Sequence, residues 1–405
     1  MLRRTALKGL MAGALAAPAM IRKAGADTRP AAIGVINDMN GAYSDLGGTG
    51  SVLAAQMAAE DFGGSVLGNP IRILAADHQN KADLATSLTS EWIERSGVTA
   101  IADGGASSTA LAIQFVTARR GAIYLATGPA TSDLTGARCS PYGFHWTYDS
   151  YCLAAGSALA LLARGGRTWF FITADYAFGH SVERDATEIV TKGGGKSLGH
   201  VLAPIGTSDF SSHLLQAQAS GADVIALALG GGDLVNAVKQ AREFGLRHGP
   251  QAFVGLLTFN TDVHAMGLEA AEGMFVTTAY DWEINPEMNA FARRFMARHG
   301  GKPPSMVQAG TYGGVLHYLK AVREAGTLDT DAVADKMRAL PVNDFMSENV
   351  HIRKDGRVMR PVYVAKVKTP SESKKPWDYL AVLDTIPPEK AFRPLAEGRC
   401  PLVAK

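Results

Sequence analysis

The chain has 405 residues, of which 47% are apolar and 19% charged, so it can bury a large core and is neither disordered nor a coiled coil. Residues 1–26 carry five Lys and Arg and no Asp or Glu, so removing them changes the formal net charge from +2 to about −3. A mildly acidic mature chain excludes nucleic acid as a partner, because binding to a phosphate backbone needs a basic surface.

The first 26 residues have the pattern of a twin-arginine export signal. Arg3 and Arg4 precede a modest apolar run over residues 9–20, and small residues end the segment at Ala26. The run is too short and too rich in Ala and Gly to anchor the chain in a bilayer. We expect cleavage after Ala26 and a periplasmic mature chain that begins at Asp27. The alternative is a basic, frayed amino terminus.

From residue 31 to residue 126, short apolar strands alternate with amphipathic helices. The expected strands are Ala31–Asn37, Ile71–Ala76, Val98–Ala102 and Ile123–Ala126, and the expected helices are Ser51–Phe62, Asp83–Arg95 and Thr109–Arg120. The strands are continuous apolar runs, which is typical of a parallel sheet covered by helices on both faces.

A second alternating run follows a long loop and covers residues 151–278. Its expected strands are Thr168–Thr173, Ser197–Leu202, Val224–Leu229, Ala252–Leu257 and Met274–Thr278, and its expected helices are Tyr151–Arg164, Val182–Lys192, Phe210–Ser220 and Asp233–Phe244. Repeated strand–helix units imply right-handed crossovers. The sequence therefore predicts an α/β fold with two doubly wound parallel-sheet lobes.

The remainder of the chain has a different pattern. Helices are expected at Glu287–His299, Met306–Ala325 and Asp331–Leu340, followed by a hairpin from Asn349–Ile352 through a turn to Val362–Val367, and by a last strand, Trp377–Leu383. A block of helices with a terminal strand pair predicts that the chain returns to the lobes built earlier.

Export changes the interpretation of the three cysteines, because disulfides persist outside the cytoplasm. Cys139 lies in a polar loop and Cys400 in the terminal segment, whereas Cys152 opens an apolar helical run. We predict a Cys139–Cys400 disulfide that holds the tail, with Cys152 as a core residue. The alternative is three free thiols.

The loops that follow the strands are the expected ligand site, because open parallel sheets bind ligands beyond the carboxyl ends of their strands. Four such loops are rich in Gly, Ser and Thr or in aromatic residues: 38–50, 103–109, 127–131 and 173–179. Hydroxyls and free amides at a helix start suit an anion such as a carboxylate. The same residues are also common helix caps, which is the structural alternative for any one loop.

An ordered set of motifs resembles the type I periplasmic binding proteins of the branched-chain amino acid (Leu/Ile/Val) class, the substrate receptors of ABC importers. The motifs are Gly34-Val35-Ile36 through Asn40-Gly41, Ala106-Ser107-Ser108-Thr109, Gly128-Pro129-Ala130-Thr131, Asp175-Tyr176-Ala177-Phe178-Gly179, Asp209-Phe210-Ser211-Ser212, Lys239-Gln240-Ala241, Glu272-Gly273-Met274 and Gln308-Ala309-Gly310-Thr311-Tyr312. The likeness covers essentially the whole mature chain, and its specificity lies in the order of the motifs.

The resemblance implies two lobes joined by a three-segment hinge, with the ligand in the cleft between them. We expect residues 27–148 and 280–357 in the first lobe, 149–279 and 358–390 in the second, and 391–405 as a tail. The implied partners are a small-molecule ligand and ABC permease subunits in the membrane. No cofactor or metal is implied.

In similar proteins, Ser and Thr loops of the first lobe hold the ligand carboxylate, and aromatic residues of the second lobe close over the ligand. The residues we expect to bind the ligand here are Tyr43, Leu46, Ala106, Ser107, Ser108, Ala130, Thr131, Tyr176, Phe178, Gly231, Phe259, Tyr280 and Trp282.

One departure from the amino-acid receptors concerns the ligand. Where they carry an acidic group for the ligand ammonium, this chain reads Gly255-Leu256-Leu257-Thr258-Phe259. An unpaired ammonium would lose a charge-assisted hydrogen bond. The motifs His145-Trp146-Thr147-Tyr148 and Lys375-Pro376-Trp377-Asp378-Tyr379 resemble a subgroup linked with aromatic carboxylates, which is therefore the expected ligand class. Branched-chain or other amino acids are the alternative.

Motifs for catalysis are missing from the sequence. Gly41–Gly50 lacks the Lys-Ser/Thr ending of a P-loop, no Gly-x-Ser-x-Gly elbow is present, and the histidines lack zinc-ligand spacing. We expect a binding protein rather than an enzyme. A ligand-sensing receptor on the same fold is a second non-enzymatic alternative.

Overall fold

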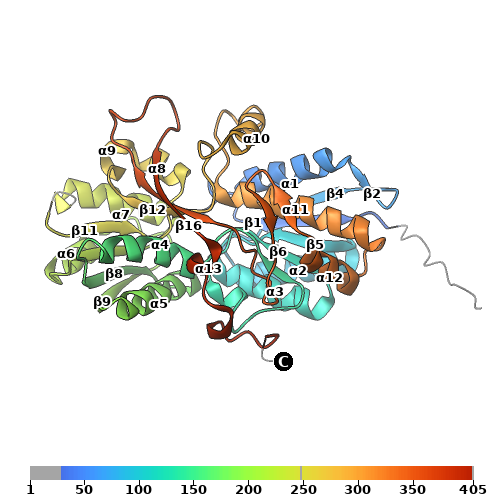
Figure 1. The fold of residues 1–405 in the computed structure, drawn as a ribbon, viewed down its shortest axis with the longest axis horizontal. Coiled ribbons are helices and arrows are strands. Elements are labelled where there is room, and N and C mark those ends of the chain that lie inside the picture. Colours follow the sequence, from blue (N-terminus) through green and yellow to red (C-terminus); the bar gives the residue numbers. More distant parts are fainter. Residues whose placement is uncertain (1–28, 247–248, 404–405) are drawn as a thin grey trace, which may run out of the picture.

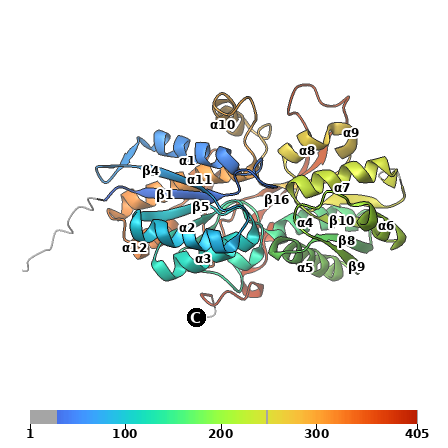
Figure 2. The ribbon, with the colours of Figure 1, turned by 180° about the vertical axis from the view of Figure 1, so that it is seen from behind.

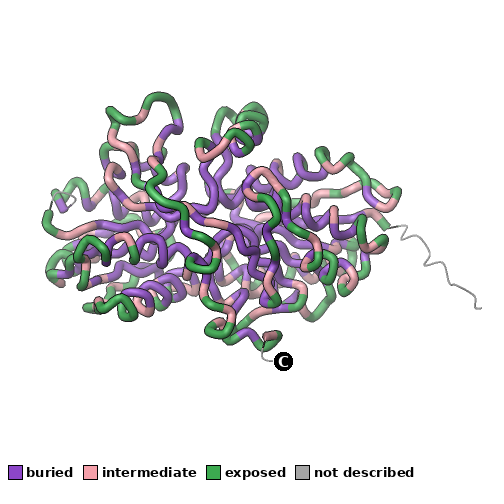
Figure 3. The backbone as a smooth tube through the Cα atoms, in the orientation of Figure 1, coloured by how far each residue is buried: buried purple, intermediate pink, exposed green. Residues whose placement is uncertain are grey.

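The computed structural model describes residues 29–246 and 249–403, and it has two lobes that lie side by side, each built on its own sheet (Figure 1). Buried residues fill the middle of both lobes, and exposed residues gather on their outer helices and loops (Figure 3). The predicted export signal, residues 1–26, lies outside the described residues. The α/β fold with two parallel-sheet lobes is confirmed.

The first lobe holds a five-stranded parallel sheet in the order β4-β1-β5-β6-β7. Its strands are β1 (Ala32–Asn37), β4 (Arg72–Asp77), β5 (Val98–Asp103), β6 (Ile123–Ala126) and β7 (Gly143–His145), with a small ribbon of β2 (Ser65–Val66) and β3 (Asn69–Pro70). Its early helices are α1 (Gly48–Phe62), α2 (Ala82–Arg95) and α3 (Ser107–Arg120). Every residue of β1 and β6 is buried, as expected for strands covered on both faces.

The second lobe holds a seven-stranded sheet in the order β16-β15-β12-β11-β10-β8-β9. Its strands are β8 (Thr168–Ala174), β9 (Lys196–Ala203), β10 (Val224–Ala228), β11 (Ala252–Gly255), β12 (Phe275–Thr278), β15 (Val362–Val367) and β16 (Leu380–Ile386). The helices are α4 (Ser150–Leu162), α5 (Ala177–Lys192), α6 (Ser211–Ala219), α7 (Gly231–Glu243), α8 (Asn260–Met266), α9 (Leu268–Ala271) and α13 (Pro388–Ala391). Strands β15 and β16 join the parallel strands in antiparallel pairs.

Three later helices return to the first lobe. They are α10 (Pro286–Met296), α11 (Met306–Ala325) and α12 (Thr330–Ala339), and a hairpin of β13 (Val342–Asp344) and β14 (Ser347–Val350) follows them. Helix α11 lies against α1, and its side chains share one apolar core with β1 and β5 (Figure 2). The first lobe is therefore completed by chain that follows the second lobe.

Local capping explains where these long helices begin and end. The Ser305 hydroxyl accepts the backbone N–H groups of Val307 and Gln308 at 3.2 Å, and the Gln308 side chain accepts the Ser305 N–H at 2.9 Å. Gly326, with a φ of 68°, ends α11 in the left-handed conformation. Asp149 caps α4 through the Cys152 N–H at 2.8 Å, and Asn285 caps α10.

The structure corrects part of the predicted element list. Strand β7 and helices α8 and α9 were not predicted, because three to seven residues are too few for a periodic pattern. The predicted hairpin of Asn349–Ile352 with Val362–Val367 is wrong. Strand β14 pairs with β13, whereas β15 pairs with β12 and β16, so only a single bridge between Ile352 and Val358 marks the predicted turn.

The chain passes between the lobes at residues 146–149, 279–285 and 351–361. These crossings form the expected three-segment hinge. The lobe limits stated from the sequence, 27–148 with 280–357 and 149–279 with 358–390, remain a proposal. Over the described residues, no helix combines the length and the apolar character needed to cross a membrane.

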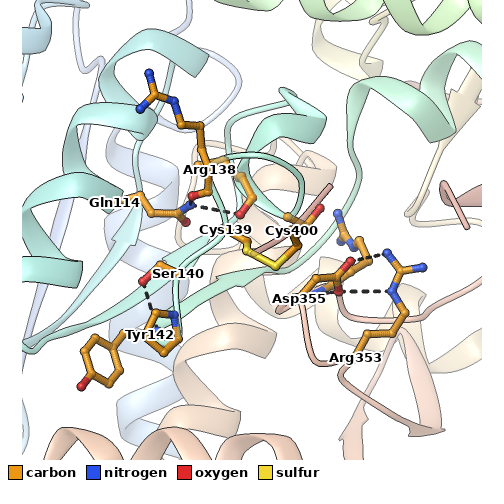
Figure 4. The surroundings of a disulfide bond; sticks show 12 residues. Gln114, Arg138, Cys139, Ser140, Tyr142, Arg353, Asp355 and Cys400 are labelled. Atoms are coloured by element: carbon orange, nitrogen blue, oxygen red, sulfur yellow. Dashed lines mark hydrogen bonds and ion pairs between the residues drawn. A yellow bond between two sulfur atoms is a disulfide. The ribbon is translucent and has the colours of Figure 1, made fainter. Parts of the chain in front are cut away.

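The C-terminal segment runs below the junction of the lobes (Figure 1). Arg393 pairs with Asp185 at 2.9 Å and Glu188 at 2.6 Å on α5 of the second lobe. Beyond it, the predicted disulfide is present: Cys400 is bonded to Cys139, in a first-lobe loop, across a sequence separation of 261 (Figure 4). Cys152 is a buried free thiol, as predicted. The tail is thus a fourth connection between the lobes.

Candidate functional site

A cavity lies between the lobes, where the strands of both sheets end at their carboxyl edges. It is lined by Asn37, Asp38, Tyr43, Leu46, Gly47, Asp103, Gly105, Ala106, Ser107, Gly128, Ala130, Tyr148, Tyr176, Phe178, Leu257 and Val307. The cavity has about 30 Å³ of room for solvent. A ligand of several heavy atoms therefore requires the lobes to part or the lining side chains to move.

The loop after β1 carries Tyr43 and is fixed by one carboxylate. Asp38 is buried, and its Oδ1 accepts the Gly41 N–H at 2.6 Å while its Oδ2 accepts the Tyr43 N–H at 2.9 Å. The Asn80 side chain donates to the same Oδ2 at 2.6 Å. These bonds turn the Gly-rich loop back on itself, so the Tyr43 ring is held at the cavity wall.

The loop after β5 leads straight into α3 and presents its amino end to the cavity. Ala106 occupies the N-cap position, so no side chain of the described residues caps this 14-residue helix. The Ser107 hydroxyl accepts the Thr131 N–H at 3.1 Å, which ties the loop after β5 to the loop after β6. The uncapped N–H groups and the helix dipole give this wall a positive potential.

A buried carboxyl lies beneath these loops. The side chain of Asp103 accepts the Asn37 side-chain N–H at 2.8 Å and the Gly105 N–H at 3.2 Å. Burial raises the pKa of Asp103 above its usual value, against the lowering effect of its hydrogen bonds with Ser51, Asn37 and Gly105. Asp103 positions the ends of β1 and β5 relative to each other.

Two aromatic side chains come from the second lobe. Tyr176 precedes α5 and Phe178 lies in its first turn, with ring centroids 5.9 Å apart. The hydroxyl of Tyr176 contacts the hydroxyl of Tyr43 across the cavity. Burial raises the pKa of both phenols, so both stay protonated at neutral pH.

Gly231, at the start of α7, lies close to the loop after β1 of the first lobe. Its φ is 56°, and a Cβ at this position would lie 2.4 Å from the Ala42 carbonyl oxygen and 3.0 Å from the Tyr43 ring. Only glycine fits this left-handed conformation at this spacing. The neighbouring Gly232 N–H donates to the same Ala42 oxygen at 3.4 Å.

The structure brings seven of the predicted ligand-binding residues to the cavity wall: Tyr43, Leu46, Ala106, Ser107, Ala130, Tyr176 and Phe178. Thr131, Gly231 and Phe259 lie just behind it, where the Thr131 hydroxyl meets the Ser181 hydroxyl at 2.7 Å and the Phe259 ring meets Tyr148 edge-on at 6.0 Å. The binding roles of all these residues remain a proposal.

Three predicted residues lie away from the lining. Ser108 is half-buried in the first turn of α3. The Tyr280 ring packs edge-on against Phe345 with centroids 5.9 Å apart. The indole of Trp282 donates to the Trp377 carbonyl at 3.0 Å, so Trp282 fixes the loop before β16. The aromatic content of the sequence does not distinguish such packing residues from cavity residues.

Nine lining residues were not named individually as ligand-binding residues: Asn37, Asp38, Gly47, Asp103, Gly105, Gly128, Tyr148, Leu257 and Val307. Five of them, Asp38, Gly47, Asp103, Gly105 and Gly128, lie in the loops that were predicted from the sequence as the ligand site. Asn37 and Asp103 are the last residues of β1 and β5, so the strand-end rule contains the signal that finds them. Val307, at the start of α11, lies 204 residues beyond Asp103 in the sequence (307 − 103) and carries no local signal.

Among the lining residues that the structure describes, none is Lys, Arg or His. The positive ends of helices replace them: the amino ends of α3, α5 and α7 meet around the cleft, none with a side-chain cap. Across residues 29–246 and 249–403, no group of three or more His, Cys, Asp and Glu could hold a metal ion. The arrangement can hold a small organic anion.

The sequence profile that matches this chain and the two solved structures described next are all of periplasmic binding proteins. A sequence profile described as "Periplasmic binding protein" matches residues 30–375. The structure resembles a periplasmic binding protein from Burkholderia mallei with a TM-score of 0.90 and 44% identity, covering 92% of this chain and 99% of that one. It resembles a branched chain amino acid ABC transporter periplasmic ligand-binding protein from Burkholderia xenovorans LB400 with a TM-score of 0.82 and 39% identity, covering 92% and 99%.

The names of several more distant relatives state a ligand. An amino acid binding protein of Pseudomonas aeruginosa is 22% identical over 297 residues, 73% of this chain and 79% of that protein. Two solute binding proteins of ABC transporters from R. palustris, solved with benzoate and with 4-hydroxybenzoate, have TM-scores of 0.79 and 0.80 at 17% and 20% identity. They cover 88% and 89% of this chain, and this chain covers 96% and 97% of theirs. At 17% and 20% identity, the likeness to these two structures shows the fold alone.

Proposed function

Because the chain belongs to the periplasmic binding protein family, we propose that it captures a small aromatic carboxylate between its two lobes. The chain is a periplasmic substrate-binding protein of an ABC importer, and proteins of this family bind small molecules and work with ABC permeases. The family consists of receptors rather than enzymes. The twin-arginine type of the export signal stays a prediction.

The single observation that carries the carboxylate is the uncapped amino end of α3 at the cavity wall. Its free N–H groups and the Ser107 hydroxyl are donors, and the helix dipole favours negative charge there. A helix end binds an anion without a cationic side chain, which suits a wall with neither Lys nor Arg among its described residues.

The aromatic character of the ligand is supported by the remaining wall. Tyr43, Tyr148, Tyr176 and Phe178 offer ring faces and edges, and Leu257 adds an aliphatic surface from the loop after β11. Aromatic pairs in edge or offset contact gain about 0.5–1.5 kcal/mol beyond burial of their area. The benzoate and 4-hydroxybenzoate complexes of proteins with this fold support the same ligand class.

A second candidate, an amino acid, is favoured by one specific observation. The carboxylates of Asp38 and Asp103 line the cavity and could face a ligand ammonium. Against it, Asp38 already accepts three short hydrogen bonds from its own loop and Asn80, and Asp103 is occupied by Asn37 and Gly105. A free carboxylate for a charge-assisted bond is therefore not evident in this wall.

Binding then works by closure. The ligand meets the α3 end on the first lobe, and the second lobe brings Tyr176 and Phe178 over it and excludes water. A ligand shifts the equilibrium toward the closed form only by its differential affinity for that form. Contacts made by both lobes at once therefore decide which ligands close the protein for the permease.

The experiment is a thermal-shift series on the chain beginning at Asp27 with benzoate, 4-hydroxybenzoate and leucine. We expect a rise of several degrees in Tm with at least one aromatic acid and none with leucine, because a ligand that binds only the folded chain stabilises it. A rise with leucine alone overturns the aromatic acid and supports the amino-acid candidate.

A further inference from the structure

One acceptor in the cavity wall has no partner. Asn37 is 1% exposed, and its Oδ1 is buried without a hydrogen bond to any described residue. Its Nδ2 donates to the Gly48 carbonyl at 2.9 Å and to Asp103 Oδ2 at 2.8 Å. Because both partners are acceptors, exchanging the nitrogen and oxygen of the Asn37 amide would lose both bonds. The atom without a partner is therefore the oxygen, Oδ1.

A buried acceptor without a partner is uncommon and destabilises a fold. Asn37 lines the cavity together with Ser107 and Tyr43, so a group on a bound ligand can reach this wall. The neighbouring carboxyl groups of Asp38 and Asp103 line the same cavity. They add negative potential, which favours a hydrogen-bond donor on the ligand and disfavours its carboxylate.

Resting on the proposed function, we infer that the ligand carries a hydrogen-bond donor in addition to its carboxylate, and that Asn37 Oδ1 accepts it. The carboxylate lies at the amino end of α3 and the donor at Asn37. The substrate class is then an aromatic acid with a hydroxyl or amino substituent, and Asn37 determines that specificity.

Matched ligand pairs test this on the unaltered protein. 4-Hydroxybenzoate and 3-hydroxybenzoate are compared by calorimetry with 4-fluorobenzoate and 3-fluorobenzoate, which are similar in size but have no donor. We expect at least one hydroxylated acid to bind about tenfold or more tightly than its fluorinated partner, because a site built to pair a hydroxyl rejects analogues that lack it.

The Asn37→Leu variant removes the acceptor at similar volume. Both acids of a pair are measured on the same variant, so a general loss of affinity from the missing Nδ2 bonds cancels in the ratio. We expect the ratio to fall to within about threefold of unity. Asn40→Leu is the control, because Asn40 lies on the loop that follows β1, is exposed, and among the described residues its side chain bonds only to Asp77. Asn40→Leu should keep the ratio.

The outcomes separate the two proposals. If the acids bind but hydroxylated and fluorinated partners bind equally, the donor inference is wrong and the proposed function stands. If the preference persists in Asn37→Leu, the role of Asn37 is wrong. If no aromatic acid binds, both the proposed function and this inference are wrong. Should Asn37→Leu not fold, the ligand pairs on the unaltered protein still decide whether a donor is required.

Discussion

The hydroxyls of Tyr43 in the first lobe and Tyr176 in the second contact each other across the cleft. Both side chains line the cavity, so this contact joins the lobes at the site itself. It couples the position of the loop after β1 to the amino end of α5.

Removing one of these hydroxyls should open the ligand-free protein. In Tyr176→Phe the Tyr43 hydroxyl is left without its partner in the closed form, at a cost of about 1–3 kcal/mol. We expect a larger radius of gyration by small-angle X-ray scattering. The double variant Tyr43→Phe/Tyr176→Phe should open less than the single one, because no buried hydroxyl is left unpaired. Equal effects would show that the two hydroxyls are not coupled.

Ser107 and Ser108 form a matched pair for the carboxylate site. Ser107 lines the cavity and accepts the Thr131 N–H, whereas Ser108 is half-buried outside the lining. Ser107→Ala should weaken binding of the tightest aromatic acid about tenfold, as expected for one hydrogen bond to a charged group. Ser108→Ala should change it less than about twofold. Calorimetry checks both, and the reverse ranking would place the carboxylate elsewhere.

A methyl group at Gly231 should block closure. Its Cβ would lie 2.4 Å from the Ala42 oxygen of the other lobe, whereas a Cβ at Gly232 meets nothing within 4 Å. Gly231→Ala should therefore lower ligand affinity at least about tenfold and enlarge the ligand-free molecule, at a cost to stability of about 1 kcal/mol from the positive φ. Gly232→Ala should do neither. If Gly231→Ala changes neither the ligand affinity nor the size of the ligand-free molecule, the lobes meet differently in solution.

Asp262 gives a pH dependence whose sign follows from its burial. It is the third residue of α8 and its side chain accepts the Phe259 N–H at 2.9 Å, and burial raises its pKa from 3.8 to about 7. Between pH 4 and 7 the folded chain holds a proton that the unfolded chain has lost, so this carboxyl destabilises the fold as pH rises through that range.

Asp262→Asn keeps an acceptor for Phe259 and removes the charge. We expect the variant to be more stable than the parent at pH 8, by at least about 1 kcal/mol, and to match it more closely near pH 4. Urea unfolding at both pH values measures this. Asp384→Asn, on the exposed part of β16, is the control and should leave the pH profile unchanged. A gain that is the same at both pH values would show that ionisation is not its cause.

The Cys139–Cys400 disulfide should contribute a large part of the free energy of unfolding. Closing a loop of 261 residues removes unfolded-state entropy worth about 5.6 kcal/mol in the simplest model. Cys139→Ser/Cys400→Ser should lower the free energy of unfolding by about 2–5 kcal/mol. Intact mass should rise by two daltons on reduction of the parent, and Cys152→Ser should leave that difference in place.

The two-lobed fold could be predicted because its strands are short, continuous apolar runs and most of them are separated by an amphipathic helix. Strands such as Val224–Ala228 are buried on both faces, and that requirement is visible in the sequence. The partner of β15 could not be predicted, because an antiparallel strand next to β12 satisfies the same apolar pattern as a hairpin with β14.

The site was predictable where a local rule applied. Ser107 and Ala106 follow a strand and open a helix, which marks them from the sequence. Trp282 and Tyr280 are aromatic, as many ligand-binding residues are. In the structure, however, Trp282 contacts Trp377 and Tyr280 contacts Phe345. The position of Asn37 at the end of β1 could be predicted from the sequence, but its unpaired oxygen could not, because that depends on the folded neighbourhood.

The tail that joins Arg393 to α5 and Cys400 to Cys139 has a consequence for how the molecule denatures. All of the second lobe, together with α10, α11 and α12, lies inside one covalent ring. Since α11 also supplies the apolar cover of the first sheet, neither half can melt without disturbing the other. Oxidised protein should therefore show one cooperative heat-absorption peak, and reduction should move that peak to a lower temperature.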